Sequence, residues 1–268
     1  MEKKLTDLEL RTIQLELLKD VHMFCQENGI RYSLAGGSLL GAVRHHGYIP
    51  WDDDIDLMMP REDYERFAST YHSACNEVLD LRENSCDVEI FIKVSRKGTR
   101  MVDLVEGRCM WGVNIDIFPI DGAPEDSYLH GFKIMRMRRK LSRICPYYMA
   151  GGKTNRALGM AKYLMKRILY PYFGSAKQLK REIDTLAASY KLDNSQEAGV
   201  LLGSYGIREI CPAKTFLRYS HILFEGEMYS TIVDYDTYLS AIYGDYMKLP
   251  PVEKRISHHL YDTFADIS

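Results

Sequence analysis

The chain has 268 residues, of which 46% are hydrophobic and 27% are charged, and its formal net charge is −2. This composition excludes a disordered or fibrous chain and supplies a sizeable core for one large domain or two small ones. The small net charge argues against a protein whose whole surface binds polyanions. Six cysteines show neither a C-x-x-C pair nor zinc-site spacing, so we expect reduced, mostly buried thiols of a cytosolic protein.

The N-terminal stretch MEKKLTDLEL contains no apolar signal core. No apolar run approaches the length that spans a bilayer. We therefore expect a cytoplasmic protein, and any contact with the inner face of a membrane would be peripheral.

The chain opens with a predicted amphipathic helix over 7–28. Thr6 and Glu9 have the spacing of a capping box, Gly29 supplies a C-terminal stop, and apolar residues recur between them at helical intervals. A short strand over 31–35 then leads to a Gly-Gly-Ser turn, and a helix follows over 38–45. Small residues ahead of a helix leave backbone N–H groups available for a phosphate.

Next comes an acidic strand, predicted from Asp54 to Met59. Alternation along a strand places Asp52, Asp54 and Asp56 on one face and apolar side chains on the other. Three like charges on a half-buried face repel one another unless a cation lies between them. Ligands that are all oxygen suit Mg²⁺ or Mn²⁺. Together with a phosphate-binding turn, this pattern indicates metal-assisted phosphoryl transfer.

Two alternatives to a catalytic metal site remain for the acidic cluster. One is a solvated turn, although solvated turns do not continue into Ile-Asp-Leu-Met-Met. The other is a calcium loop of the EF-hand type, which requires glycine where Leu57 stands.

Residues 60–124 continue the predicted sheet. A helix is expected over 61–73, and strands over 88–95 and 99–105 with a turn at 97–98. Lys93 lies among apolar residues, as either an edge lysine or a phosphate contact. Asp116 lies in an alternating strand and is costly there unless it is paired or bound to metal. Asp121 is expected in a turn.

The section from Gly131 to Arg181 is strongly basic, with fourteen Lys or Arg and no Asp or Glu. Helices are predicted over 125–144 and 155–170. A basic amphipathic helix can lie on an anionic membrane, whereas the alternative is a solvated basic face that balances an acidic core. No nucleic-acid motif accompanies the charge. The tail is predicted to be mainly helical, with helices over 177–191 and 234–241.

At this point three strings resemble the LicD family of phosphocholine transferases, which is related to fukutin and fukutin-related protein. They are GGSLLGAVRHHGYIPWDDDIDLMMPREDY at 36–64, NIDIFPIDG at 114–122, and YGDYMKLPP at 243–251 followed by an arginine and two histidines. The resemblance implies an α+β (α/β) fold, a nucleotidyltransferase-like mixed β-sheet flanked by helices with a mainly helical C-terminal half. The catalytic core would span 1–124, and the basic and helical region 125–268 would complete the site.

The resemblance also implies a reaction. Phosphocholine, or a related phospho-alcohol, would pass from CDP-choline or another CDP-alcohol to a hydroxyl of a cell-surface glycan such as teichoic acid or lipopolysaccharide, releasing CMP. The acceptor could be lipid-linked, and the basic section is expected to contact it. Two alternatives are a nucleotidyltransferase that releases pyrophosphate and a non-catalytic nucleotide-binding protein.

The expected site residues follow from the same resemblance and from the residue chemistry. Choline cannot accept hydrogen bonds, so it requires an aromatic face. The expected catalytic residues and ligands of Mg²⁺ or Mn²⁺ are Asp54, Asp56 and Asp116. The expected substrate-binding residues are Gly37, Ser38, Arg44, Trp51, Lys93, Trp111 and His258.

Overall fold

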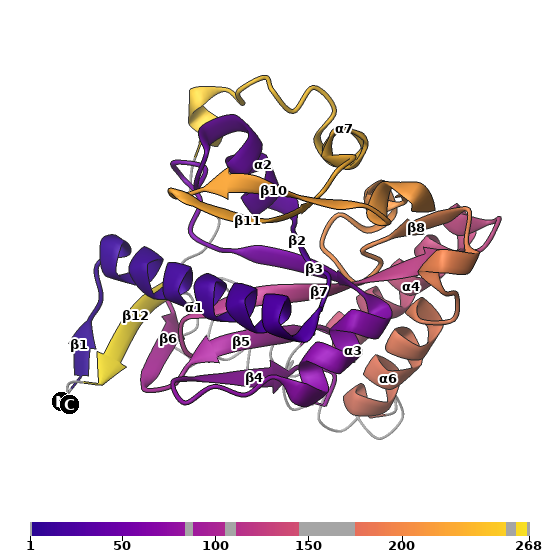
Figure 1. Ribbon diagram of the computed structural model, residues 1–268. Helices are drawn as coiled ribbons and strands as arrows, with labels where there is room; N and C mark the ends of the chain where they lie inside the picture. Colours follow the sequence, from indigo (N-terminus) through magenta and orange to yellow (C-terminus); the bar gives the residue numbers. More distant parts are fainter. Residues whose placement is uncertain (1, 84–87, 105–110, 145–174, 256–260, 267–268) are drawn as a thin grey trace.

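The computed structural model describes residues 2–83, 88–104, 111–144, 175–255 and 261–266. A mixed β-sheet with the order β2-β3-β7-β5-β4 forms its centre (Figure 1). Strands β3 and β7 run parallel, and the other neighbours on this path run antiparallel. The strands are β2 (Ser33–Leu34), β3 (Asp56–Pro60), β4 (Asn76–Asp80), β5 (Ile92–Arg96) and β7 (Asn114–Ala123). Strand β8 (Glu197–Gly199) pairs with the end of β7 and with β9 (Cys211–Pro212).

Helix α1 (Asp7–Asn28) crosses the sheet in front, as does α3 (Arg61–Thr70) (Figure 1). The predicted capping box is present, and Gly29 ends α1 in the left-handed conformation. Leu17, Leu18 and Val21 are fully buried. Each such side chain contributes about 1.5–3 kcal/mol by leaving water, so one amphipathic face fixes this helix on the sheet.

A second layer lies above the sheet in Figure 1 and consists of α2 (Gly36–His45), α7 (Tyr235–Tyr243) and a hairpin of β10 (Tyr219–Phe224) and β11 (Glu227–Ile232). The hairpin is fastened to β2 because Ile232 N–H donates to Ser33 Oγ at 3.0 Å and Ser230 N–H donates to Tyr32 OH at 3.2 Å. The C-terminal half of the chain therefore covers the strand that leads into the Gly-Gly-Ser turn.

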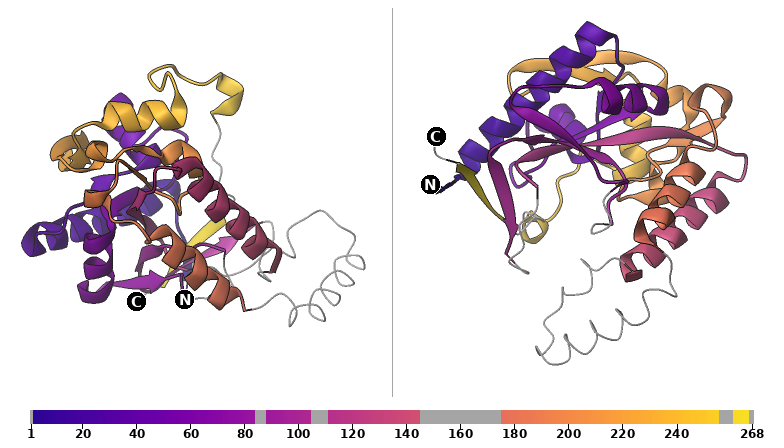
Figure 2. Two further views of the ribbon diagram at one scale, coloured as in Figure 1. Left: turned by 90° about the vertical axis from the view of Figure 1, so that its right-hand side faces the viewer. Right: turned by 90° about the horizontal axis from the view of Figure 1, so that it is seen from below.

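Helices α4 (Ser127–Ile144) and α6 (Ala176–Ala187) lie side by side at one end of the sheet (Figures 1 and 2). They share a small core that includes Ile134, Leu141 and Ile183. At the opposite end, β12 (Tyr261–Asp266) pairs with both β1 (Glu2–Lys4) and β6 (Thr99–Asp103) and brings the two termini together (Figure 2). No helix of the described residues is long and apolar enough to cross a membrane.

Several sequence predictions need correction. Strands over 92–96 and 99–103 exist, but β5 pairs with β4 and β7 whereas β6 turns away to pair with β12. Strand β4 was not predicted. The helix expected over 38–45 already begins at Gly36, and the helix expected over 61–73 ends at Thr70. The helix predicted over 155–170 lies outside the described residues.

The prediction of a mainly helical tail is wrong for its described part. Helices α6 and α7 are present, although α6 ends at Ala187, and the tail also contributes β8, β9, the β10–β11 hairpin and β12. Glu225 and Gly226 turn the hairpin with positive φ angles. Its strands expose residues on both faces, so they lack the strict alternation by which half-buried strands are predicted.

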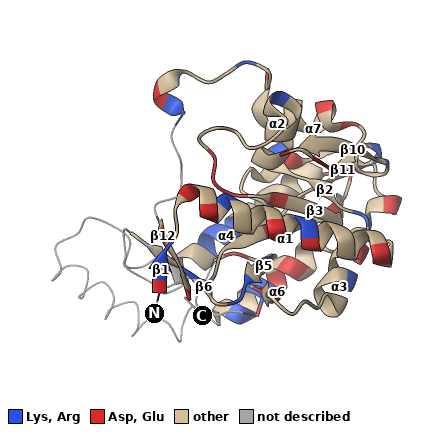
Figure 3. Ribbon diagram, turned by 60° about the vertical axis from the view of Figure 1, so that its left-hand side comes forward, with Lys and Arg blue, Asp and Glu red and all other residues tan. Residues whose placement is uncertain are grey.

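Part of the predicted cationic surface is used inside the fold. Lys177 and Arg181 pair with Glu83 at 2.5 and 3.0 Å. Lys180 is fully buried and donates to the carbonyl oxygens of Leu81 and Glu89 at 2.6 and 2.8 Å. Acidic and basic residues accordingly lie close together around α6 and β5 (Figure 3).

Candidate active site

One row of ionisable side chains crosses three strands of the central sheet. Asp56 on β3 is the register partner of Asp116 on β7, and Asp116 is the register partner of Lys93 on β5. Register partners on adjacent strands are about 4.8 Å apart and point to the same face. The sheet therefore brings together two carboxylates and one ammonium group from distant parts of the sequence.

Lys93 is buried and holds Asp116 through both carboxylate oxygens. Its Nζ lies 2.6 Å from Oδ1 and 2.9 Å from Oδ2, and 3.2 Å from Glu89 Oε2. Burial by itself would lower the pKa of Lys93, but Asp116 and Glu89 outweigh it and raise this pKa above its usual value. The side chain consequently stays cationic beside the carboxylates.

Asp56 lies in a concentrated negative field. Burial raises its pKa well above the usual value, the charges of Asp54, Asp116 and Asp52 add to this, and Lys93 opposes it. Asp52 and Asp54 precede β3, which begins at Asp56 rather than at Asp54 as predicted. Both carboxylates nevertheless remain close enough to Asp56 to raise the cost of ionising it.

The Gly-Gly-Ser segment forms the first turn of α2 against these carboxylates. The first helical bond is donated by Leu39 N–H to Ala35 O at 3.0 Å, so the preceding three N–H groups have no carbonyl partner within the helix. Gly36 has a φ of +46°, and a Cβ there would lie 3.2 Å from Asp56 Oδ2. A Cβ on Gly37 would lie 2.7 Å from Asp52 Oδ2. Glycine thus permits carboxylates to approach the positive end of a helix.

Ser38 joins the helix to the acidic strand. Its Oγ accepts a hydrogen bond from Asp56 N–H at 2.9 Å, and the side chain is buried. This contact fixes the start of β3 relative to the start of α2.

Three tyrosines from the C-terminal part of the chain border the same place. The hydroxyls of Tyr205 and Tyr243 are 2.7 Å apart, and both side chains lie within 4 Å of the position of a Cβ on Gly36. Tyr261 donates to Asp53 O at 3.4 Å. Sequence reasoning singled out Tyr243 within its motif but missed Tyr205 and Tyr261. The count of nineteen tyrosines was the one available signal, and it does not indicate positions.

With this geometry in view, residues 29–135 match the family model described as "LicD/FKTN/FKRP, nucleotidyltransferase domain". The chain carries a LicD-family domain. It is also similar to the protein of Haemophilus influenzae named lipopolysaccharide cholinephosphotransferase LicD, at 29% identity over 272 residues that cover 98% of this chain and 99% of that protein. A shorter similarity links it to human and mouse proteins named ribitol 5-phosphate transferase FKRP, with 46% identity over 54 residues, 20% of this chain and 11% of theirs.

The LicD-family domain contains most of the predicted site residues, and they fall into two groups. The first group lies around the row of Asp56, Asp116 and Lys93. Trp111 belongs to it, because its ring centroid is 5.9 Å from Lys93 Nζ. Arg44 and Trp51 lie around the other end of α2. Arg44 donates to Tyr246 O at 3.0 Å from the last turn of α2, and Trp51 has Arg255 Cζ 5.5 Å from its ring centroid. His258 lies outside the described residues.

The possible metal ligands of the LicD-family domain suit a divalent cation, since Asp54, Asp56 and Asp116 offer only carboxylate oxygens. A positive charge nearby would also favour the ionised form of Asp56, which the surrounding carboxylates disfavour. Among the described residues, no three Asp, Glu, His or Cys side chains converge closely enough to coordinate one ion as they stand. Lys93 already holds both oxygens of Asp116. Asp116 could therefore serve as a ligand only if it shared or released this contact.

Proposed function

We propose that this protein is a transferase that moves phosphocholine, or a related phospho-alcohol, from a CDP-alcohol to a hydroxyl of a cell-surface glycan. The observation that carries the proposal is the row of Asp56, Asp116 and Lys93 beside the N-terminus of α2, inside a LicD-family domain. Similarity over nearly the full length to a lipopolysaccharide cholinephosphotransferase supports the substrate class.

The proposed step exchanges one P–O bond for another. The acceptor hydroxyl oxygen attacks the phosphorus that carries the alcohol, the bond from this phosphorus to the bridging oxygen breaks, and CMP leaves with that electron pair. In this proposal Asp116 receives the hydroxyl proton, which requires the acceptor hydroxyl to bind within hydrogen-bond reach of the Asp116 carboxylate. Lys93 then keeps the Asp116 carboxylate oriented by its two contacts.

The phosphates require positive charge on the side opposite the acceptor. The N–H groups at the start of α2, at Gly37 and Ser38, supply donors to phosphate oxygens. A cation such as Mg²⁺ or Mn²⁺ held by Asp54 and Asp56 would offset the charge of the phosphates and of departing CMP. Without a cation, the same carboxylates would repel the donor.

The alcohol lies against aromatic side chains in this proposal. Trp111 is next to Lys93, and Tyr205 and Tyr243 border Gly36. An aromatic face attracts a quaternary ammonium by about 0.5–2 kcal/mol per contact. Trp51 is a weaker candidate, because it packs at the edge of the core and beside Arg255.

The test is a screen of CDP-choline, CDP-ribitol, CDP-glycerol and CDP-ethanolamine with Mg²⁺ or Mn²⁺ and crude cell-wall or capsule glycan. Mass spectrometry follows CMP and the modified glycan. We expect release of CMP that depends on the cation and on one CDP-alcohol, and that is lost in Asp56→Asn. Pyrophosphate release from CTP would instead indicate a nucleotidyltransferase. Binding of a CDP-alcohol with no turnover under any condition would indicate a non-catalytic protein.

A further inference from the structure

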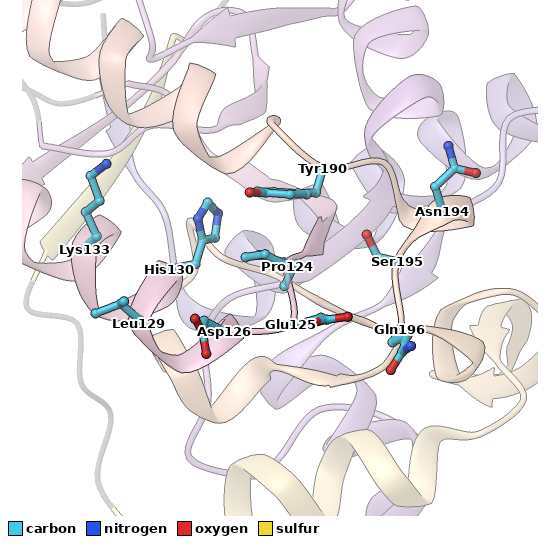
Figure 4. Close-up of a pocket in the computed structure, with 11 residues that line it drawn as sticks. Pro124, Glu125, Asp126, Leu129, His130, Lys133, Tyr190, Asn194, Ser195 and Gln196 are labelled. Atoms are coloured by element: carbon cyan, nitrogen blue, oxygen red, sulfur yellow. The ribbon is translucent and has the colours of Figure 1, made fainter.

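A cavity of about 670 Å³ lies at the end of β7 that is remote from Asp116 (Figure 4). Ala123, in the cavity wall, lies seven positions after Asp116, which corresponds to about 23 Å along a strand. One wall comes from the start of α4 and the other from the segment that follows α6. The volume is typical of small-molecule sites, about 300–1,000 Å³.

The cavity wall combines an aromatic ring with planar polar groups. Tyr190 is 42% exposed, and its ring and the His130 ring are perpendicular, with centroids 5.4 Å apart at 89° (Figure 4). Asn194, Gln196 and Glu125 also line the cavity. A sugar ring has an apolar C–H face and a rim of hydroxyls, so an aromatic face and amide or carboxylate groups complement it.

One buried polar atom in the cavity wall, Nε2 of His130, has no hydrogen-bond partner among the described residues, and His130 as a whole is 8% exposed. Leaving such an atom unsatisfied costs about 1–3 kcal/mol. Burial and Lys133 lower the pKa of His130, so the imidazole is neutral at pH 7 and has one donor and one acceptor nitrogen. A hydroxyl, which both donates and accepts, complements either of them.

The charge of the wall favours a neutral ligand. Glu125 and Asp126 face the cavity along with the single cation Lys133, so an anion would meet net repulsion. Two further cavities share this wall. One of about 520 Å³ shares Pro124, Glu125 and Gln196, and another of about 540 Å³ shares Lys133 and continues between α4 and α6. An elongated ligand suits such a series.

We propose that this series of cavities, the α4–α6 groove, binds a neutral stretch of the acceptor glycan several sugar units away from the hydroxyl that is modified. The identification of the glycan as the acceptor rests on the proposed function. The groove would hold the polymer, while the carboxylate site acts on a hydroxyl further along the chain.

Binding is tested by saturation-transfer NMR with maltotriose, lactose and diacetylchitobiose as probes. We expect transfer to at least one probe, weakened about tenfold or more in Tyr190→Ala, which corresponds to about 1.4 kcal/mol. Tyr190→Phe keeps the ring and should bind as wild type does. Tyr128→Ala is the matched control. Tyr128 is an exposed tyrosine on the first turn of α4, close in sequence to the cavity residue His130, but it does not line the cavity.

Kinetics supply a second readout on folded protein. In Tyr190→Ala, and in Asn194→Ala as a milder variant, the KM for a polymeric acceptor should rise while kcat and cation-dependent hydrolysis of the CDP-alcohol stay unchanged. If no probe binds and the acceptor KM is unchanged in both variants, the groove proposal is wrong. If the probes bind through Tyr190 but no CDP-alcohol turns over, the groove stands as a glycan site and the proposed function fails.

Discussion

Two aspartates of β7, five residues apart and on opposite faces of the strand, have different environments. Asp121 is buried and receives Arg61 through two hydrogen bonds of 2.7 and 2.6 Å, and Arg61 also contacts Asp184 at 2.8 Å. Asp116 receives Lys93, but it also lies beside Asp56 and adds to the unfavourable field there. A guanidinium fork satisfies both oxygens of a buried carboxylate.

The difference between these two environments distinguishes a structural role for Asp121 from a functional role for Asp116. Each carboxylate of the Arg61 network contacts a guanidinium within 3.3 Å, including Asp80 and Asp184 around Arg82. At the other end of β7, Lys93 contacts both Asp116 and Glu89, and Asp56 lies in the combined field of Asp52, Asp54 and Asp116. Clustered carboxylates with perturbed pKa values in one site indicate function, whereas matched ion pairs indicate structure.

The largest expected effect tests the structural end. Arg61→Ala leaves Asp121 buried without its partner, so we expect the free energy of unfolding to fall by about 3–5 kcal/mol, measured by urea denaturation. Turnover per folded molecule should be unchanged. Lys191→Ala removes an ion pair to Glu62 whose side chains are 71% and 69% exposed, and its free energy of unfolding should stay close to that of wild type. Equal losses of unfolding free energy in Arg61→Ala and Lys191→Ala would show that the buried network stabilises the fold no more than an exposed ion pair does.

Asp56→Asn and Asp54→Asn test the functional end. Turnover should fall below about a tenth, a barrier increase of at least about 1.4 kcal/mol. The unfolding free energy of Asp56→Asn should equal or exceed that of wild type. Because the native pKa of Asp56 is raised, the wild type loses stability relative to Asp56→Asn as pH rises above about 4, the unfolded pKa. Melting temperatures at several pH values check the direction of this stability difference. If either variant keeps more than about a tenth of wild-type turnover, the substituted residue is not a cation ligand or a base in this step.

Glu209 shows a third environment for a buried carboxyl, in which neutral hydrogen-bond donors contact the carboxyl oxygens and the charge of Arg138 only partly offsets the cost of burial. Tyr238 OH donates to Oε2 at 3.1 Å, Tyr205 N–H donates to Oε1 at 3.3 Å, and burial raises the pKa of Glu209 to about 8. The native state binds this proton more tightly, so stability falls from the unfolded pKa of about 4.3 up to pH 8, by at most about 1.4 kcal/mol per pH unit.

Glu209→Gln should flatten this pH dependence, and the melting temperatures of wild type and variant between pH 6 and 8.5 measure it. Because Glu209 holds Tyr205 beside Gly36, turnover of Glu209→Gln should stay close to wild type below pH 7. Parallel pH profiles of the two proteins would show that Glu209 is already ionised there.

The smallest expected effect concerns the basic section. Arg136, Arg139 and Lys140 are exposed on α4, whereas Arg138 donates to Gly203 O and is left intact. Reversing the three exposed cations to glutamate should weaken sedimentation with anionic vesicles about threefold to tenfold, and high salt should abolish the difference. Hydrolysis of the CDP-alcohol alone should not change. Equal, salt-insensitive sedimentation would favour a solvated basic face that serves the fold.

Some of the site could be predicted from short stretches of sequence. The capping box and Gly29 fixed the limits of α1, and alternation placed Asp56 and Asp116 on strands. Asp121 was wrongly expected in a turn, because the Asp-Gly pair is typical of turns, yet Asp121 lies within β7 and its carboxylate is satisfied by Arg61. The division of the chain at residue 124 stays a prediction.

The amino-acid sequence alone determined the features that a few neighbouring residues encode: the helix start at Thr6, the Gly-Gly-Ser turn, the acidic strand and the family motifs. The tertiary structure alone decided that Lys93 meets Asp116, that β6 pairs with β12 rather than β5, that Tyr205 borders Gly36, and that Tyr261 donates to the backbone carbonyl of Asp53. Capping and alternation depend on hydrogen bonds and burial within one element. Pairing between distant strands depends on closing long loops and on which faces can be buried together, and no local pattern specifies that outcome.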